Sequence, residues 1–338
     1  METTENRKIV LRANFSKVIG NGHLNRLLSL AYFLKNDFEI IFITNDNSNI
    51  IKKMILSVCN EVYHLPFFEN NFDEIKYIRE NFLNGNEIIV LDGYQFITDY
   101  QKEIKNYCSK LVCIDDEAQN HFVADLVINH APGVHPEDYK KENYTKLCLG
   151  LNYLMIRQSF LFQKQPLKLK TKTETLFICF GGSDNHDYSK KITETLTKIT
   201  EIKKIILIIG PHYTIVDNWI EKLQINHKKL VAFRDLSEAE MSQQMLLSDI
   251  LIVPASTISL EALALNKIII TGITASNQKK LHDGILPLDQ VFSIGDFKNL
   301  TPQKLNSKIQ SIFDKRGEDI SRVTVKPSHF LLKEFKLL

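Results

Sequence analysis

The sequence predicts an α/β protein with two doubly wound, Rossmann-like domains that face a cleft. Short apolar runs alternate with amphipathic stretches of helix length along nearly the whole chain, and this alternation restarts in the second half. Fully apolar strands separated by helices indicate a parallel sheet that is covered on both faces. The length of 338 residues agrees with two domains, since one domain takes about 150 residues.

The first domain is expected to span residues 1–162. Its apolar runs are short and rich in Ile, Val and Leu, which is typical of buried strands. Residues 24–34 carry an apolar stripe at helical spacing, as an amphipathic helix requires. The expected strands are residues 8–12, 38–43, 87–92, 111–116 and 126–129.

Residues 163–175 are expected to be the linker, because they are rich in Lys and Thr, contain Pro166 and lack sustained periodicity. The second domain is then expected over residues 176–316. A tail at 317–338 ends in an amphipathic stretch, which we expect to form a helix that packs back on the first domain. The expected strands of the second domain are residues 176–180, 205–209, 230–233, 250–254 and 268–271.

The place of a ligand follows from this architecture. Ligands of open parallel sheets bind beyond the carboxyl ends of the strands. Two such sheets that face each other would bind a substrate in the cleft between them, as in the glycosyltransferase-B type of architecture. The alternation alone is equally compatible with other two-domain α/β proteins.

Composition narrows the class of protein. With 44% hydrophobic and 24% charged residues and a net charge of +2, the chain can bury a full core and has no charge excess that would call for nucleic acid or a membrane surface. It has no apolar run of the roughly 20 residues that span a bilayer, and its first eight residues lack the apolar core of a signal peptide. We therefore expect a cytoplasmic protein.

The cysteines have no metal-site or CxxC spacing, and their number is odd. Most of them lie in apolar runs, so we expect small buried hydrophobic residues in a reducing compartment, with no disulfide and no bound metal. They are Cys59, Cys108, Cys113, Cys148 and Cys179.

The sharpest local motif is the segment 19–26 (IGNGHLNR), which follows the first strand and opens the first helix. Gly20 and Gly22 permit a tight turn, and the helix start offers N–H groups to an anion. His23 could act there as a general base. The alternative is a glycine-containing turn with a capping histidine. The segment is not a dinucleotide fingerprint, because Arg26 follows the two glycines where a small residue is required.

Two turns of the second domain suit a phosphate. Gly181, Gly182 and Ser183 follow its first strand, and Ser256 and Thr257 begin the helix after residues 250–254. Both offer backbone N–H groups and hydroxyl groups to an anion. The alternative for the first is a simple glycine-rich turn.

Glu261 lies one turn beyond Ser256 and Thr257, where its carboxylate could accept hydrogen bonds from both hydroxyl groups of a ribose. The alternative is a capped helix whose Glu261 faces solvent. Two phosphate-binding turns in one domain favour a nucleotide as ligand.

Three further strand ends carry polar candidates. Asp92 and Tyr94 follow one strand and could line the same cleft. Asp115 and Asp116 end another, and because neighbouring strand residues point to opposite faces, we expect one to face the cleft and the other to cap a loop. The amides of Asn277 and Gln278 could read a base or a sugar.

Taken together these motifs resemble the UDP-sugar hydrolases of pseudaminic acid biosynthesis, which release UDP from UDP-2,4-diacetamido-2,4,6-trideoxy-β-L-altropyranose. That family is itself similar to the bacterial N-acetylglucosaminyltransferase that makes lipid II. The resemblance covers most of the chain. It is carried by Arg12, residues 19–26, Asp92, Tyr94, Asp115, Asp116, Asn129, Gly150, Tyr153, Ile156, Arg157, residues 181–184, residues 255–257 and 261–263, Asn277 and Gln278.

The resemblance implies roles for these positions. His23 would activate water for attack on the anomeric carbon with inversion and without metal, and Glu261 would bind the ribose. It implies no cofactor and a nucleotide sugar as partner, with UDP as product, and we expect a monomer that binds no nucleic acid. The implied diphosphate ligands are Gly181, Gly182, Ser183, Ser256 and Thr257, and the implied substrate ligands are Arg12, Asn14, Gly22, Arg26, Asp92, Tyr94, Asp116, Asn277 and Gln278.

One departure from the family pattern concerns the turn after the first strand. Family members carry Arg-x-Asp there, whereas this chain has Arg12, Ala13 and Asn14. The change removes a carboxylate that could partner His23 or a sugar amide. Two other functions stay open: a glycosyltransferase of cell-surface polysaccharide synthesis that passes the sugar to an acceptor hydroxyl, and a nucleotide-sugar binding protein without turnover. The retention of His23 argues against the last.

Overall fold

The computed structural model describes residues 7–13, 22–161, 174–214, 217–315 and 328–338. The chain divides into two compact units, Met1–Gln158 with Lys326–Leu338, and Ser159–Val325. We call them unit 1 and unit 2. The division falls slightly before residue 162, because Ser159 bonds to unit 2: its N–H donates to Glu238 Oε1 (2.7 Å), and its carbonyl accepts from Ser242 Oγ (2.9 Å). Residues 162–173, most of the expected linker, lie outside the described residues.

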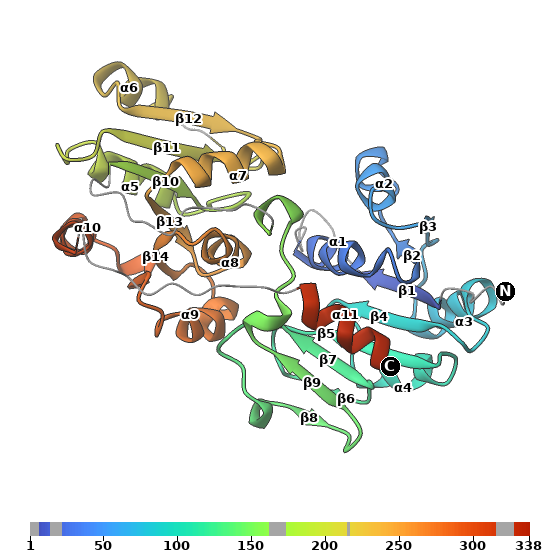
Figure 1. Ribbon diagram of the computed structural model, residues 1–338. Helices are drawn as coiled ribbons and strands as arrows, with labels where there is room; N and C mark the ends of the chain where they lie inside the picture. The colour runs from blue at the N-terminus through green and yellow to red at the C-terminus, as the bar shows by residue number, and fades with distance from the viewer. Residues whose placement is uncertain (1–6, 14–21, 162–173, 215–216, 316–327) are drawn as a thin grey trace. The chain divides into compact units, whose positions relative to one another are not determined.

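Unit 1 contains a seven-stranded parallel sheet in the order β3-β2-β1-β4-β5-β7-β9 (Figure 1). The central strand β1 therefore pairs with β2 on one side and β4 on the other. The strands are β1 (Lys8–Ala13), β2 (Glu39–Thr44), β3 (Glu61–His64), β4 (Ile88–Asp92), β5 (Lys110–Ile114), β7 (Leu126–Asn129) and β9 (Lys146–Leu149), and β6 (His121–Phe122) pairs separately with β8 (Lys140–Lys141). The helices are α1 (Gly22–Leu34), α2 (Asn49–Leu56), α3 (Asn71–Phe82), α4 (Thr98–Lys105) and α11 (Ser328–Leu337).

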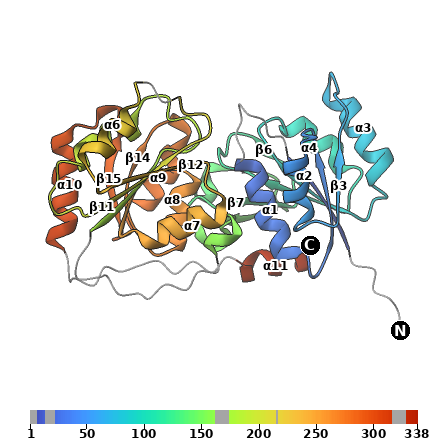
Figure 2. The ribbon, with the colours of Figure 1, turned by 90° about the horizontal axis from the view of Figure 1, so that it is seen from above.

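Helix α11, at the end of the chain, packs against α1 (Figure 2). Leu331 and Phe335 are fully buried, and the Phe335 ring meets Phe38 edge to face at 6.4 Å between ring centroids. Lys336 Nζ adds an ion pair with Asp37 at 2.5 Å. The amphipathic tail thus forms a helix whose apolar stripe extends the core of unit 1.

Unit 2 contains a six-stranded parallel sheet in the order β12-β11-β10-β13-β14-β15. Figure 2 shows α6 and α10 on one face of this sheet and α7, α8 and α9 on the other. The strands are β10 (Thr175–Cys179), β11 (Lys204–Ile209), β12 (Leu230–Arg234), β13 (Ile250–Pro254), β14 (Ile268–Ile273) and β15 (Val291–Asp296). The helices are α5 (Tyr188–Leu196), α6 (Trp219–Asn226), α7 (Glu238–Leu247), α8 (Thr257–Ala264), α9 (Lys279–Ile285) and α10 (Pro302–Asp314).

The predicted parallel α/β fold is confirmed, and the predicted strands coincide with strands of the two sheets to within a few residues. Sequence patterning missed β3, β9 and β15, which are three of the four edge strands of the two sheets. Each of them is only partly buried, so none forms the fully apolar run that marks a central strand.

None of the helices in the described ranges combines the length and the apolar character that crossing a membrane requires. All five cysteines are free, and four of them are buried. Burial raises the pKa of the Cys59 thiol to about 12, so that thiol behaves as a small hydrophobic residue.

Candidate functional site

In each unit, the sheet order brings candidate residues to the place where the strand order reverses. In unit 1, the chain leaves β1 toward β2 on one side, while β4 lies on the other. The carboxyl ends of β1 and β4 therefore flank the point where the strand order reverses, which is where open α/β sheets bind ligands. His23 lies in the first turn of α1, the helix that follows β1, and Asp92 is the last residue of β4.

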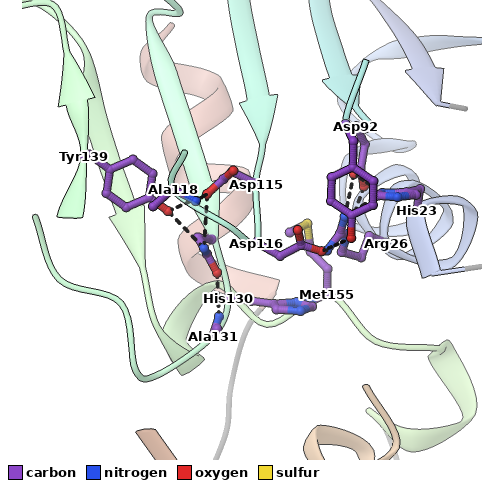
Figure 3. Close-up of polar contacts among 12 residues, drawn as sticks. His23, Arg26, Asp92, Asp115, Asp116, Ala118, His130, Ala131, Tyr139 and Met155 are labelled. Atoms are coloured by element: carbon purple, nitrogen blue, oxygen red, sulfur yellow. Dashed lines mark hydrogen bonds and ion pairs between the residues drawn. The ribbon is translucent and has the colours of Figure 1, made fainter. Parts of the chain in front are cut away.

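The imidazole of His23 is held by the carboxylate of Asp92 (Figure 3). His23 Nδ1 lies 2.7 Å from Asp92 Oδ1, and the two side chains are 5% and 0% exposed. Burial alone would raise the pKa of Asp92, but the charge of Arg26 and the hydrogen bond to His23 outweigh it, so the pKa is lowered. The carboxylate is thus ionised and only accepts, so in the tautomer whose Nδ1–H donates to it, Nε2 is the ring nitrogen with a free lone pair.

Arg26, one turn further along α1, binds both carboxylates of this cluster. It donates to Asp92 from Nε (3.0 Å) and Nη2 (2.6 Å) and to Asp116 Oδ2 from Nη1 (2.7 Å). Burial disfavours its charge, but Asp92 and Asp116 more than compensate, so the pKa of Arg26 is raised. The guanidinium expected to bind substrate is therefore engaged by the protein.

Tyr94 closes the cluster on the side open to solvent. Its ring meets His23 edge to face at 4.9 Å between centroids, and its hydroxyl lies 3.4 Å from Asp116 Oδ2. Partial burial and the charge of Asp116 raise the pKa of Tyr94 to about 12, so the phenol stays protonated near neutral pH and can donate a hydrogen bond.

These side chains line a cavity of about 160 Å³ that lies within unit 1. One part of its wall is polar and is formed by the cluster. Another part is apolar and includes Phe96, Ile97, Cys113 and Phe122. A pocket with an apolar wall and a few convergent polar groups is the usual form of a small-molecule site.

Asp115 and Asp116 follow β5 rather than ending it, and they have different partners. Asp116 accepts from Arg26, whereas Asp115 Oδ2 accepts from the N–H of Ala118 at 2.9 Å and from the hydroxyl of Tyr139 at 2.9 Å. Asn129 joins the second group by donating to the Tyr139 oxygen at 2.9 Å. Asp115 therefore shapes the loops beside the cavity.

Arg12, which we expected to bind the substrate, is engaged by other residues of unit 1. It is 2% exposed and donates to both carboxylate oxygens of Glu74 at 3.0 and 3.1 Å and to Asn45 Oδ1 at 2.8 Å. The Phe96 ring lies 5.5 Å from its guanidinium carbon. Arg12 thus anchors the end of β1 to α3. Asn14, like residues 19–21 of the glycine motif, lies outside the described residues, and Gly22 is the exposed first residue of α1.

His130 was not predicted, although it follows the predicted strand 126–129 as the other candidates follow theirs. It is 5% exposed, and its Nδ1 accepts from the Met155 N–H at 3.1 Å. Burial and the charge of Arg26 lower the pKa of His130 to about 4. Figure 3 shows it near Asp116 and Arg26, where it is a neutral donor at neutral pH.

In unit 2, the two predicted phosphate turns follow the neighbouring strands β10 and β13. The first is shaped by a close approach: a Cβ on Gly210 would lie 2.2 Å from the Gly181 carbonyl oxygen. Gly181 has φ +75°, which also favours glycine. The Gly182 carbonyl accepts from the His212 N–H at 2.9 Å. The turn is therefore held against the end of β11, a contact that sequence reasoning missed.

The start of α5 does not serve this turn as an anion site. Asp184 accepts from the N–H groups of Tyr188 (3.0 Å) and Ser189 (2.8 Å), so a carboxylate of the protein occupies the position that a phosphate would take. The amides of Gly181, Gly182 and Ser183 remain as candidate donors from this loop.

The start of α8 is different. Ser256 is the N-cap of α8, and its side chain makes no capping bond to the helix. Glu261, one turn further along, is 1% exposed, so the alternative of a solvent-facing glutamate is wrong.

Gln278 stabilises the loop after β14. Its side chain donates to the Thr274 hydroxyl at 3.0 Å and accepts from the Thr274 N–H at 2.8 Å. Asn277, beside it, is exposed.

Among the described residues, no group of three or more His, Cys, Asp or Glu side chains could hold a metal ion. No protein-family model matches the sequence.

Two curated proteins are similar to the chain in sequence. The uncharacterized protein MJ1062 of Methanocaldococcus jannaschii is 27% identical over 296 residues, which are 82% of this chain and 58% of that protein. The chain thus spans little more than half of that relative. The UDP-2,4-diacetamido-2,4,6-trideoxy-beta-L-altropyranose hydrolase of Campylobacter jejuni is 28% identical over 261 residues, which are 76% of this chain and 88% of that enzyme.

Solved structures match nearly the whole chain. MurG of Acinetobacter baumannii has a TM-score of 0.65 at 11% identity and covers 98% of this chain and 100% of its own. Anabaena Alr3699/HepE in complex with UDP-glucose has a TM-score of 0.62 at 12% identity, and the UDP-GlcNAc 2-epimerase of M. jannaschii 0.58 at 11%, each over 98% of this chain and 100% of its own. The protein has the two-domain α/β fold of the glycosyltransferase-B class.

Proposed function

We propose that this protein hydrolyses a UDP-sugar, releasing UDP from a UDP-diacetamido-trideoxyhexose for nonulosonic acid biosynthesis. The observation that carries the proposal is the buried pair of His23 and Asp92 at a cavity where the strand order of unit 1 reverses. The 28% identity to a curated hydrolase of that substrate class supports it.

In the proposed reaction, His23 Nε2 takes a proton from water as the water oxygen bonds to the anomeric carbon. The bond between that carbon and the phosphate oxygen breaks, and its electron pair leaves with UDP. Attack from the face opposite UDP inverts the anomeric configuration. A base held within hydrogen-bond reach of one water is sufficient for this step, because a diphosphate is a good leaving group.

Unit 2 is proposed to hold the nucleotide. Amide N–H groups of the 181–183 turn and the start of α8 would bind the diphosphate and stabilise the charge that develops on it. The buried Glu261 would bind the ribose hydroxyl groups. These roles agree with the chemistry of the donors and with their common position at the switch point between β10 and β13.

The test is UDP release from UDP-2,4-diacetamido-2,4,6-trideoxy-β-L-altropyranose in water enriched in ¹⁸O, with EDTA and without an acceptor. We expect turnover in the wild type, label in the sugar and none in UDP, and an initial product of inverted configuration. His23→Gln should lose at least about 100-fold in rate, whereas His121→Gln, at an exposed histidine of the same unit, should retain it. UDP release only when an acceptor is added would identify a transferase, and UDP binding without turnover would identify a binding protein.

A further inference from the structure

Arg26 Nη2 lies 2.7 Å from the same ring nitrogen of His23 that Asp92 binds. Nη2, His23 Nδ1 and Asp92 Oδ1 therefore form a triangle with sides of 2.6 to 2.7 Å. All three side chains are less than a tenth exposed, so their charges are weakly screened by water. The cation stands beside an imidazole that would itself become a cation on gaining a proton.

We propose that Arg26 is a positioning residue that keeps the His23 imidazole neutral, and so able to accept a proton, by offsetting the negative charge of Asp92. A buried carboxylate alone would stabilise the imidazolium and remove the base. The catalytic meaning of this role rests on the proposed function, but the effect of Arg26 on His23 does not.

The charges around His23 come from several elements of unit 1. Asp92 ends β4, Tyr94 follows it, and Asp116 and Glu117 follow β5. Glu117 interacts electrostatically with His23. Near neutral pH Tyr94 and His130 are uncharged, since their pKa values are about 12 and about 4. Among the described residues of this cluster, Arg26 is thus the cation that faces the carboxylates of Asp92, Asp116 and Glu117.

Asp116 tunes this effect from the other side of the guanidinium. It accepts from Arg26 Nη1 at 2.7 Å and is 32% exposed. Removing its charge leaves more of the Arg26 charge to act on His23, whereas removing Arg26 leaves Asp92 uncompensated. The two substitutions should therefore shift the protonation of His23 in opposite directions.

The experiment follows the His23 ring by NMR in protein labelled with ¹⁵N-histidine, with the His23 signals assigned by their loss in His23→Gln. Arg26→Gln should raise the pKa of His23 by about one unit or more, a tenfold gain in proton affinity. Arg26→Lys, which keeps the charge, should restore most of the wild-type value. Asp116→Asn, at a partly exposed position that leaves the buried pair intact, should lower the pKa.

Arg12→Gln is the matched control, because Arg12 is another buried guanidinium of unit 1 and binds a different carboxylate, Glu74. This substitution should leave the measured pKa of His23 at its wild-type value. The proposal is overturned if Asp116→Asn leaves the pKa unchanged or raises it, or if Arg12→Gln shifts it as much as Arg26→Gln does. It is also overturned if the wild-type ¹⁵N shifts show the proton on Nε2, because Nδ1 would then accept from Arg26. No result of this titration depends on turnover.

Discussion

His23 Nδ1 and Asp92 Oδ1 lie 2.7 Å apart although 69 positions separate the two residues in the chain. The contact exists because β1 and β4 are neighbours in the sheet, so the helix that follows β1 starts beside the end of β4. Each residue alone is a polar side chain after a strand. Together with Arg26 they form a charge cluster at the reversal of strand order.

His130 should make the stability of the protein depend on pH between about 6.5 and 4. Burial and Arg26 lower its pKa to about 4 in the folded state, whereas an unfolded histidine titrates near 6.5. As the pH falls through this window, the unfolded chain takes up a proton that the folded protein excludes, so the free energy of unfolding decreases by about 3 kcal/mol. Urea unfolding of wild type and His130→Gln at pH 7.5 and 4.5 measures this. Equal decreases in the two proteins would refute the assignment.

Gly210→Ala should displace the 181–183 turn. The added Cβ would lie 2.2 Å from the Gly181 carbonyl oxygen and 2.4 Å from that of Gly182, so the backbone of the turn has to move. We expect the affinity for UDP, measured by calorimetry, to fall at least about tenfold, together with a lower melting temperature. Gly22→Ala is the steric control for melting, because a Cβ there meets nothing within 4 Å. Unchanged UDP affinity in Gly210→Ala would remove this turn from the nucleotide site.

Glu261→Gln should reduce discrimination between UDP and 2′-deoxy-UDP. A buried carboxylate that binds a ribose hydroxyl loses this hydrogen bond when the deoxy ligand binds, and the loss penalises the deoxy ligand by about 1–3 kcal/mol. In the Gln variant, the dissociation constants for UDP and 2′-deoxy-UDP should therefore be more similar than in the wild type. Titration calorimetry measures both constants. Glu221→Gln, at an exposed position of α6, should keep the wild-type ratio. A wild type that binds both ligands equally would contradict the assignment of Glu261.

Phe335→Ala should destabilise unit 1 by about 3–5 kcal/mol, because the ring is fully buried and its removal leaves a cavity between α11 and the rest of the unit. Phe330→Ala, on the same helix but 41% exposed, should cost less than about 1.5 kcal/mol. Denaturant unfolding of both variants gives the comparison. Equal small losses would show that α11 contributes little to the core.

The central strands and the order of helices and strands could be predicted from the chain, because an apolar run of five or six residues between amphipathic stretches is a local signal. The edge strands β3, β9 and β15 could not, since their exposed residues break that signal. The site residues that the chain suggested in unit 1 lie at the end of a strand, or in the turn or first helical turns that follow one, and His130 has the same kind of position after β7. Glu74 lies in the first turn of α3, and nothing in the local sequence indicates that it pairs with Arg12.

The amino-acid sequence by itself therefore determined the parallel α/β architecture and the candidate strand ends, since both depend on hydrophobic periodicity and on turn residues that act over a few positions. Only the tertiary structure decided what the charged groups do. It paired Arg12 with Glu74, placed Arg26 between Asp92 and Asp116, and directed the Asp184 carboxylate to the start of α5, the helix that follows it. The role of a charged side chain depends on the group that it contacts. For Arg12 and Arg26 that group lies on another element, far away in the chain, so no local sequence pattern encodes the contact.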